Sequence, residues 1–194
     1  MISVFISHFA KFYSPYKNEY VSKFCKGNID YEPTKIEKDE FKFEEYELKF
    51  NTISNTREKG DTRADFFEKG ISVERKIIHE LKKKGYCVSK QQEFAMINIE
   101  KIRLKGKIDG EILLDDKSML LEVKSKCGYS TINPTVADII QCQIYMYLFK
   151  YDKCLLIIEK DGSLNTLILD YDIEVIKKLF LDCCRLSDAM DLAK

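Results

Sequence analysis

The stretch KGKIDGEILLDDKSMLLEVKSK, residues 105–126, contains two apolar strands with charged residues inside them. Asp109 interrupts the first strand, and Glu122-Val123-Lys124 ends the second. The LDDKS segment between them predicts a tight turn, because Asp and Ser favour turns. A short turn makes the two strands antiparallel neighbours, so we expect Asp109 and Glu122 to lie side by side.

A pair of acids in this position is typical of a metal site. Two carboxylates held close together repel each other, and a divalent cation such as Mg²⁺ or Mn²⁺ relieves the repulsion. Lys124 shares a strand face with Glu122, where it would orient or activate a water molecule. The alternative is a solvated strand face whose charges only pair with one another. The Glu-x-Lys triplet alone does not decide, since it recurs at 40–42, 47–49 and 80–82.

A row of basic residues precedes the first acid. If residues 102–114 form one strand, alternate side chains share a face, and the basic row lies on the face of Asp109 and Glu111. Such a row is expected to follow the phosphate backbone of a nucleic acid. The row consists of Lys101, Arg103, Lys105 and Lys107.

Hydrophobic periodicity predicts the remaining elements. Their order predicts an α/β fold in which helices flank a mixed central β-sheet. We expect residues 1–65 to form an N-terminal helical or irregular appendage and residues 66–194 to form the core. Within the appendage, 1–26 suggests one or two short helices interrupted at Pro15, and 40–50 suggests either a bulged strand or a helix. The core elements expected are a helix from Gly70 to about residue 84, strands over 86–97, 102–114 and 119–126, a buried helix over 136–151, a hairpin over 154–171 and a helix over 172–192.

The first helix of the core carries an acid on its apolar side. Glu74 falls in the middle of the stripe formed by Val73, Ile77 and Leu81. Burying an unpaired charge is costly, so Glu74 needs a basic partner or the same metal ion. His79 falls on the opposite side and is expected at the surface.

The buried helix carries two polar pairs at helical spacing. Gln141 and Tyr145 are four residues apart, and Gln143 and Tyr147 repeat the spacing. Side chains four apart share a helix face, so either pair would reach the strands together. Periodicity does not choose between them.

Four motifs in this order resemble the PD-(D/E)xK nuclease superfamily. They are Gly70-x-x-x-Glu74, Gly106-x-x-Asp109, Glu122-x-Lys124 and Gln141-x-x-x-Tyr145. The likeness is nearest to the RecB-like branch that includes the CRISPR-associated exonucleases and related viral nucleases. It covers residues 70–150 and implies a restriction-endonuclease-like core.

The resemblance also implies a role for each site residue. Asp109, Glu122 and the backbone carbonyl of Val123 would hold the metal ion, with Glu74 beside them. Lys124 would position the attacking water. Gln141 and Tyr145 would contact the lysine or the DNA strand.

The cysteines depart from the pattern of many CRISPR-associated members, which bind a 4Fe-4S cluster through one early and three late cysteines. This chain offers Cys25, Cys154 and the adjacent pair Cys183-Cys184. Adjacent residues on a helix point about 100° apart and chelate one cluster poorly. We therefore do not expect a 4Fe-4S cluster, and the likeness is to cluster-free viral or mobile-element relatives.

These observations favour a divalent-metal-dependent DNA nuclease that hydrolyses phosphodiester bonds. We expect an exonuclease acting on DNA ends or single strands in replication, recombination or repair. One alternative is a structure-selective endonuclease with the same site. Another is a non-catalytic nucleic-acid-binding module. A small cluster-binding redox protein rests only on cysteine number.

Composition sets the remaining expectations. The net charge of zero gives no global attraction to nucleic acid, so binding depends on a local basic row. The odd number of cysteines, 7, favours a reducing compartment, and we expect an intracellular protein. No apolar run reaches the roughly 18–20 residues that span a bilayer, so no membrane association is expected. The resemblance also allows a homo-oligomer.

Overall fold

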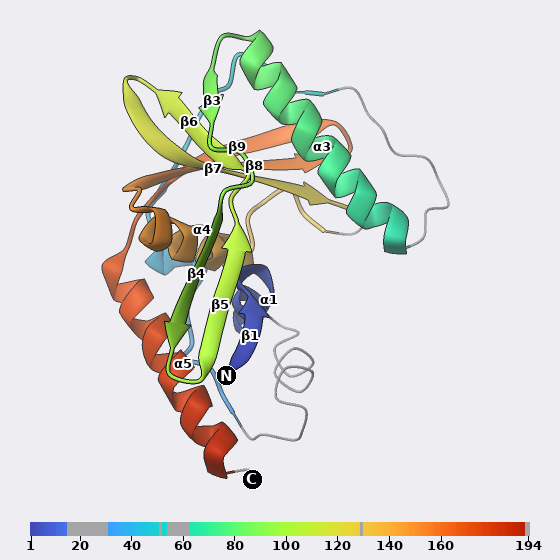
Figure 1. Ribbon diagram of the computed structural model, residues 1–194. Helices are drawn as coiled ribbons and strands as arrows, with labels where there is room; N and C mark the ends of the chain where they lie inside the picture. Colours follow the sequence, from blue (N-terminus) through green and yellow to red (C-terminus); the bar gives the residue numbers. More distant parts are fainter. Residues whose placement is uncertain (15–30, 51, 54–62, 129, 193–194) are drawn as a thin grey trace.

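The computed structural model describes residues 1–14, 31–50, 52–53, 63–128 and 130–192. A six-stranded mixed sheet forms the centre of this part of the chain (Figure 1). Only its middle pair, β7 and β8, is parallel, and the other pairs are antiparallel. In spatial order the strands are β2 (Phe43–Glu45), β9 (Ser163–Asp170), β8 (Lys153–Lys160), β7 (Lys117–Lys126), β6 (Gly110–Leu114) and β3 (Cys87–Ser89).

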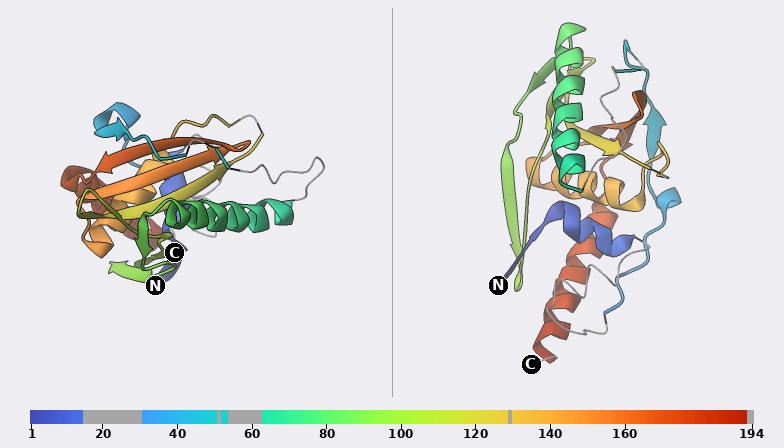
Figure 2. Two further views of the ribbon diagram at one scale, coloured as in Figure 1. Left: turned by 90° about the horizontal axis from the view of Figure 1, so that it is seen from above. Right: turned by 90° about the vertical axis from the view of Figure 1, so that its right-hand side faces the viewer.

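Helices cover both faces of this sheet (Figures 1 and 2). Helix α3 (Arg63–Lys83) packs on one face, and α4 (Val136–Phe149) with α5 (Ile173–Leu192) lies on the other. The middle strands are therefore apolar on both sides. In β8, Leu155 and Ile157 join the core beneath α3, whereas Leu156 and Ile158 join the core beneath α4. The expected α/β fold with a helix-flanked mixed sheet is confirmed.

A second, three-stranded sheet stands at the side of the first. Its order is β1 (Ile2–Phe5), β5 (Ile102–Lys107) and β4 (Phe94–Ile99). Strand β1 runs parallel to β5, and β4 runs antiparallel to it. Its inner face packs through Leu104 against α1 (Ile6–Ala10) and α4.

Two predicted strands are wrong, because each divides between the two sheets. Residues 86–97 form β3 and β4, separated by a polar turn in which Lys90 and Gln92 have positive φ angles. Residues 102–114 form β5 and β6, separated at Ile108-Asp109. In residues 102–114 the alternation of apolar residues continues in phase through the break, so periodicity alone does not show that break.

The other core elements are confirmed, with shifts at their ends. Helix α3 begins at Arg63, before the expected start at Gly70. The hairpin of β8 and β9 turns at Asp161-Gly162, both with positive φ, as a tight hairpin turn requires. For 40–50, the structure has the 3₁₀ turn η2 (Lys38–Glu40) and the short strand β2, which supports the strand alternative.

The first residues of the chain belong to the same cores as the rest. Phe9 of α1 and Phe12 of the 3₁₀ turn η1 (Lys11–Tyr13) are buried with residues of α4 and α5. Residues 2–5 form a strand where a helix was expected, and Pro15 and Cys25 lie outside the described residues. The boundary expected near residue 65 stays a prediction, since residues 54–62 are not described. Among the described helices, none has the length and apolarity to cross a membrane.

Candidate active site

The candidate site lies where the two sheets separate. Strands β6 and β7 pair as far as Gly110 and Leu121, and the chain before Gly110 leaves towards the three-stranded sheet. The end of β7, which carries Glu122 and Lys124, therefore continues past the end of β6 while still pairing with β8. Figure 1 shows β5 pointing at this junction.

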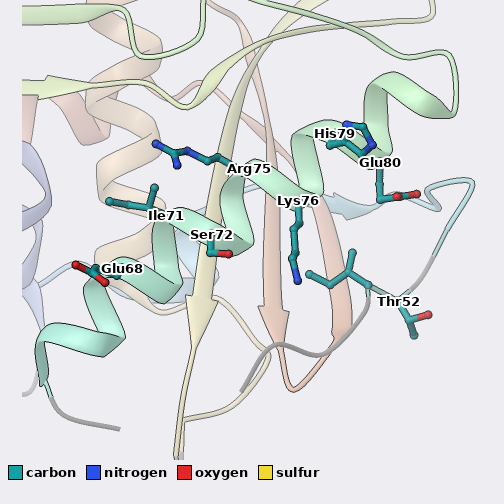
Figure 3. Close-up of a pocket in the computed structure, with 9 residues that line it drawn as sticks. Thr52, Glu68, Ile71, Ser72, Arg75, Lys76, His79 and Glu80 are labelled. Atoms are coloured by element: carbon teal, nitrogen blue, oxygen red, sulfur yellow. The ribbon is translucent and has the colours of Figure 1, made fainter. Parts of the chain in front are cut away.

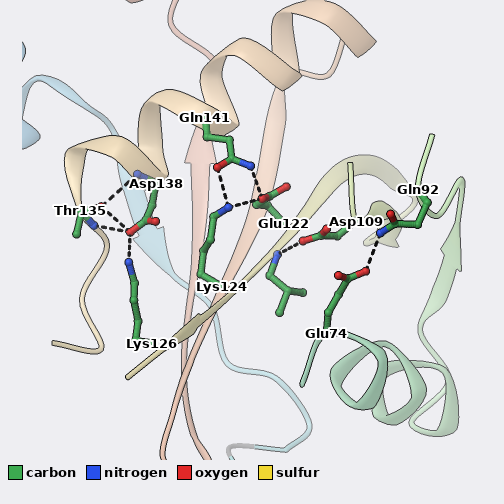
Figure 4. Close-up of polar contacts among 10 residues, drawn as sticks. Glu74, Gln92, Asp109, Glu122, Lys124, Lys126, Thr135, Asp138 and Gln141 are labelled. Carbon is green, nitrogen blue, oxygen red and sulfur yellow. Dashed lines mark hydrogen bonds and ion pairs between the residues drawn. The ribbon is translucent and has the colours of Figure 1, made fainter. Parts of the chain in front are cut away.

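Asp109 occupies the position that a continuing β6 would fill. Its Oδ2 accepts a hydrogen bond of 2.7 Å from the backbone N–H of Val123 (Figure 4). A buried backbone donor needs a partner, and at this point the partner strand has already ended. The place where β6 and β7 separate is called the fork below. The hydrogen bond made there fixes the side chain of Asp109 beside Glu122.

The ammonium group of Lys124 is held by two acceptors. Its Nζ donates to Glu122 Oε1 at 2.6 Å and to Gln141 Oε1 at 2.8 Å. Gln141 in turn donates from Nε2 to Glu122 Oε1 at 2.8 Å. Figure 4 shows the three side chains converging between β7 and α4. The alternative pair on α4 is excluded, because Gln143 bonds backbone groups of Asp170 and Asp172 instead.

The two acids have raised pKa values. Burial raises the pKa of Asp109, and the nearby charge of Glu74 raises it further. Burial also raises the pKa of Glu122, and the charge of Asp109 adds to the effect, while Lys124 opposes it. Burial lowers the pKa of Lys124, but the carboxylates of Glu122 and Asp109 outweigh this and raise it. The pair of acids is therefore under electrostatic stress that a cation would relieve.

Glu74 lies beside the acids on α3, at the edge of the apolar stripe. Its Oε1 accepts a hydrogen bond of 2.9 Å from Gln92 Nε2. Burial raises its pKa, and the charge of Glu122 contributes. Its hydrogen-bond partner is thus the amide of Gln92 and not the expected basic residue, and the other expectation, a shared metal ion, stays a prediction. His79 is exposed, as expected.

Tyr145 lies on the same side of α4 as Gln141, against Gly106 of β5. A Cβ built at position 106 would lie 2.8 Å from Tyr145 Cε1 and still nearer to its hydroxyl oxygen. Burial and the charge of Glu122 raise the pKa of Tyr145, so the phenol stays protonated. The structure therefore joins the Gly-x-x-Asp and Gln-x-x-x-Tyr motifs by direct packing.

A second acid–lysine pair continues the site along β7, and the sequence analysis missed it. Lys126 donates from Nζ to Asp138 Oδ2 at 2.5 Å. Asp138 also accepts from the backbone N–H and the hydroxyl of Thr135 at the start of α4. The pattern Thr135-x-x-Asp138 is a recognisable helix-capping signal and could have revealed this position.

The basic row belongs to the three-stranded sheet and not to the strand of the acids. Lys101 pairs with Asp191, and Arg103 donates from Nε to Asn98 Oδ1 at 2.9 Å. Lys105 and Lys107 lie on the outer face of β5, and the residues that alternate with them are buried on the inner face. The expected single face shared with Glu111 is wrong, because β5 ends at Lys107 and Glu111 of β6 bonds Ser89, Lys90 and Tyr151.

The acids offer oxygen donors of the kind that Mg²⁺ and Mn²⁺ prefer. Within the described residues, no three His, Cys, Asp or Glu side chains converge closely enough to enclose an ion on their own. Glu122 Oε2, however, is buried and makes no hydrogen bond to any described residue. A buried oxygen without a partner, next to a second carboxylate, fits a cation, with the carbonyl of Val123 as a further donor.

Two other features lie apart from this site. An open groove beside α3 is lined by Ser72, Arg75 and His79 of that helix (Figure 3). The late cysteines are free thiols: Cys154 and Cys183 are buried in the core, and Cys184 is half-buried.

Comparison with known proteins places the fold. No family model matches the chain, and no curated protein matches it. Among solved structures, the alkaline exonuclease LHK-Exo from Laribacter hongkongensis has a TM-score of 0.54 at 13% identity, covering 98% of this chain and 91% of that one. The complex of LHK-Exo with dAMP gives 0.55 at 14% identity, with the same coverage of 98% and 91%.

A third solved structure, that of SSO0001, has a TM-score of 0.51 at 13% identity. It covers 99% of this chain and 76% of that chain. Identities this low establish shared architecture and not shared activity. The chain therefore shares the restriction-endonuclease-like fold of these exonuclease structures.

Proposed function

We propose that this protein is a divalent-metal-dependent deoxyribonuclease, an exonuclease acting on DNA ends or single strands, with its active site at the fork of β6 and β7. The observation that carries the proposal is the position of Lys124, held by Glu122 and Gln141 beside Asp109. A surface ion pair needs no such enclosure, and the burial of these charges is costly. A functional role accounts for that cost.

The side chains have distinct roles in this proposal. Asp109, Glu122 and the Val123 carbonyl would hold Mg²⁺ or Mn²⁺, with Glu74 beside them. A bound divalent cation would supply Lewis-acid activation of a water molecule and neutralise charge on the scissile phosphate. Lys124 would orient the attacking water through the third of its ammonium donors, since the other two bond Glu122 and Gln141.

The helix α4 completes the site. Gln141 fixes the ammonium group of Lys124 and the Oε1 atom of Glu122 at once, so the relative position of the two is set before substrate binds. Tyr145, protonated and packed on Gly106, would donate a hydrogen bond to a phosphate oxygen of the bound strand.

The structural neighbours support the proposal at the level of substrate class. LHK-Exo is an alkaline exonuclease and was crystallised with dAMP, a mononucleotide of the kind that exonuclease cleavage of DNA releases. The order of motifs extends the proposal to the RecB-like branch of cluster-free viral or mobile-element type.

The test is digestion of end-labelled linear single- and double-stranded DNA and of a closed circle, each with Mg²⁺, Mn²⁺ or EDTA. We expect metal-dependent loss of linear DNA, with the circle spared. Lys124→Ala should lower the rate at least 100-fold, as the loss of a catalytic acid, base or positioning group commonly does. Lys117→Ala, on an exposed lysine of the same strand, is the matched control and should cleave at the normal rate.

Other outcomes decide between the alternatives. Cutting of the closed circle would make the protein an endonuclease with the same site. Folded protein that binds DNA but cleaves none of the substrates in either metal would refute the nuclease proposal in favour of a non-catalytic binding module.

A further inference from the structure

The outer face of the three-stranded sheet exposes large apolar side chains. Phe5 is 51% exposed, Phe94 is 50% exposed and Met96 is 56% exposed. They occupy the alternate positions whose neighbours, such as Val4, turn inward to the core. Solvent-exposed aromatic side chains gathered on one sheet face are typical of a binding surface.

Basic residues lie between these apolar side chains. The strand register places Lys105 between Phe5 on β1 and Met96 on β4. Lys107 lies opposite Phe94, one step nearer to the end of β5. The central strand thus supplies cations and the two outer strands supply rings and a thioether.

Across the three strands, the residues opposite one another form three cross-strand rows, at Lys107, at Lys105 and at Arg103. The row at Arg103 lies farthest from the candidate active site. Arg103 lies between Ser3 and Asn98, and its guanidinium bonds Asn98 Oδ1 at 2.9 Å. Lys105 Nζ lies 4.8 Å above the centre of the Phe5 ring, which fixes the ring and the charge together. The three rows contain three cations and no acid: Ser3, Phe5, Phe94, Met96, Asn98, Arg103, Lys105 and Lys107.

We propose that this face, the β1–β5–β4 platform, binds a segment of single-stranded DNA outside the catalytic fork. Bases would stack on Phe5 and Phe94 and pack against Met96, and phosphates would pair with Arg103, Lys105 and Lys107. Aromatic side chains interleaved with basic residues are the combination by which proteins hold single strands, because every base has a face that can stack. The proposal rests on the nuclease function proposed above and defines its substrate as a single strand.

The direction of β5 links the platform to the fork. The strand ends at Lys107, and Asp109 follows two residues later. Arg103 to Asp109 spans six residues, about 20 Å of nearly extended chain. Figure 2 shows the β4–β5 hairpin at the outside of the molecule, with α1, α4 and α5 on its inner side. A strand lying along β5 would therefore arrive at the acids.

A duplex does not fit this surface equally well. In a duplex the base faces are stacked on each other and cannot reach Phe5 or Phe94, so only the three cations would act. The phosphate contacts alone give sequence-independent and shape-independent binding. Preference for single strands therefore depends on the two rings.

The experiment measures binding of fluorescein-labelled oligo(dT) and of a labelled hairpin duplex by the full chain in EDTA, by fluorescence anisotropy. We expect the double variant Phe5→Ala/Phe94→Ala to lose about 10-fold or more in affinity for oligo(dT). Its affinity for the duplex should change less than 2-fold. Phe43→Ala is the matched control, since Phe43 is 41% exposed on β2 with Lys38 Nζ 5.6 Å from its ring centre, and it should bind normally.

A salt titration tests the phosphate contacts separately. Lys107→Gln should reduce the slope of log affinity against log salt for oligo(dT) by about 0.7, the value for one phosphate on a single strand. An unchanged slope would remove Lys107 from the platform and count against the proposal.

Three results would overturn the proposal. One is unchanged oligo(dT) affinity in the folded double variant, and another is an equal loss on the duplex. The third is a wild-type dimer that becomes monomeric in the double variant by sedimentation, which would make this face a contact between two copies of the chain. Because binding is measured in EDTA, the result tests the platform independently of whether the protein cleaves DNA. If cleavage occurs, the double variant should raise KM and leave kcat unchanged.

Discussion

Gly106 lies directly against the ring of Tyr145, with no room for a side chain between β5 and α4. A Cβ at position 106 would lie 2.8 Å from Tyr145 Cε1, closer than real Cβ contacts. Gly106 opens the Gly-x-x-Asp motif and Tyr145 closes the Gln-x-x-x-Tyr motif. This contact therefore sets the distance between β5 and α4, the two elements that carry these motifs.

Gly106→Ala is therefore expected to destabilise the protein and to displace Tyr145. Overpacking of this kind costs about 1–3 kcal/mol. Urea denaturation followed by circular dichroism measures the loss, and cleavage of DNA should fall with it. The control is Gly70→Ala, in the interior of α3 with nothing within 4 Å of the added Cβ, which should raise stability by about 1 kcal/mol. Equal stability of Gly106→Ala and wild type would show that the ring moves away without cost.

The sequence predicts the acids and the lysine of the site because their chemistry is local. Glu122 and Lys124 share a face two residues apart, and the turn before them brings Asp109 alongside. Strand alternation and a tight turn determine this arrangement, and both can be recognised in the sequence. The choice of Gln141 over Gln143 is different, since it depends on how α4 is rotated against β7.

The path of the chain between the two sheets is not predictable from alternation. Leu104, Ile108 and Ile112 keep one phase through the break, although Leu104 and Ile112 belong to different cores. The polar run from Lys90 to Glu93 was the available signal for the earlier break, because four polar residues in succession do not fit a half-buried strand. The contribution of β1 to a sheet with β5 joins residues about 100 apart, and no local pattern encodes such a pairing.

Binding of a divalent cation by the acids should appear as thermal stabilisation. Addition of Mn²⁺ is expected to raise the melting temperature of the wild type, because an ion that binds only the folded state stabilises it by about 2.7 kcal/mol at 100 times its Kd. In Asp109→Asn and Glu122→Gln the shift should be lost. The measurement is differential scanning fluorimetry at pH 8 with and without Mn²⁺.

The control for that measurement is Asp116→Asn, at an exposed position of the turn between β6 and β7 with φ of 61°, where asparagine is well tolerated. It should keep the full Mn²⁺ shift. A shift retained by both active-site variants would place the ion elsewhere.

A buried acid of α5, Asp182, bonds residues of the N-terminal segment. Asp182 accepts hydrogen bonds from the Tyr13 hydroxyl at 2.9 Å, from the Thr34 backbone N–H at 2.9 Å and from the Thr34 hydroxyl at 2.7 Å. Asp182→Ala removes all three and is expected to cost about 3 kcal/mol, since bonds to a charged acceptor are the stronger kind. Urea denaturation should show this loss, with Asp182→Asn intermediate. Asp188→Ala, at an exposed position of the same helix, should change stability by less than about 0.5 kcal/mol. A loss as small as that for Asp182→Ala would show that the Asp182 carboxylate contributes little to holding the segment.

Asp138 should make stability depend on pH in the acid range. Burial opposes its ionisation, but Lys126 and Lys124 and the Thr135 backbone N–H outweigh burial, so its pKa lies below the ordinary value of 3.8. The folded state then binds fewer protons than the unfolded state, and the free energy of unfolding rises with pH through this range. The stabilisation from ionised Asp138 is complete above about pH 5 and declines as pH falls below about 4. Urea denaturation of wild type and Asp138→Asn between pH 7 and pH 3 should therefore give a difference in unfolding free energy that is largest at pH 7 and shrinks towards pH 3. Asp188→Asn, the control, should differ little from wild type in unfolding free energy. A difference for Asp138→Asn that stays constant with pH would mean that the lost contacts do not depend on the carboxylate charge.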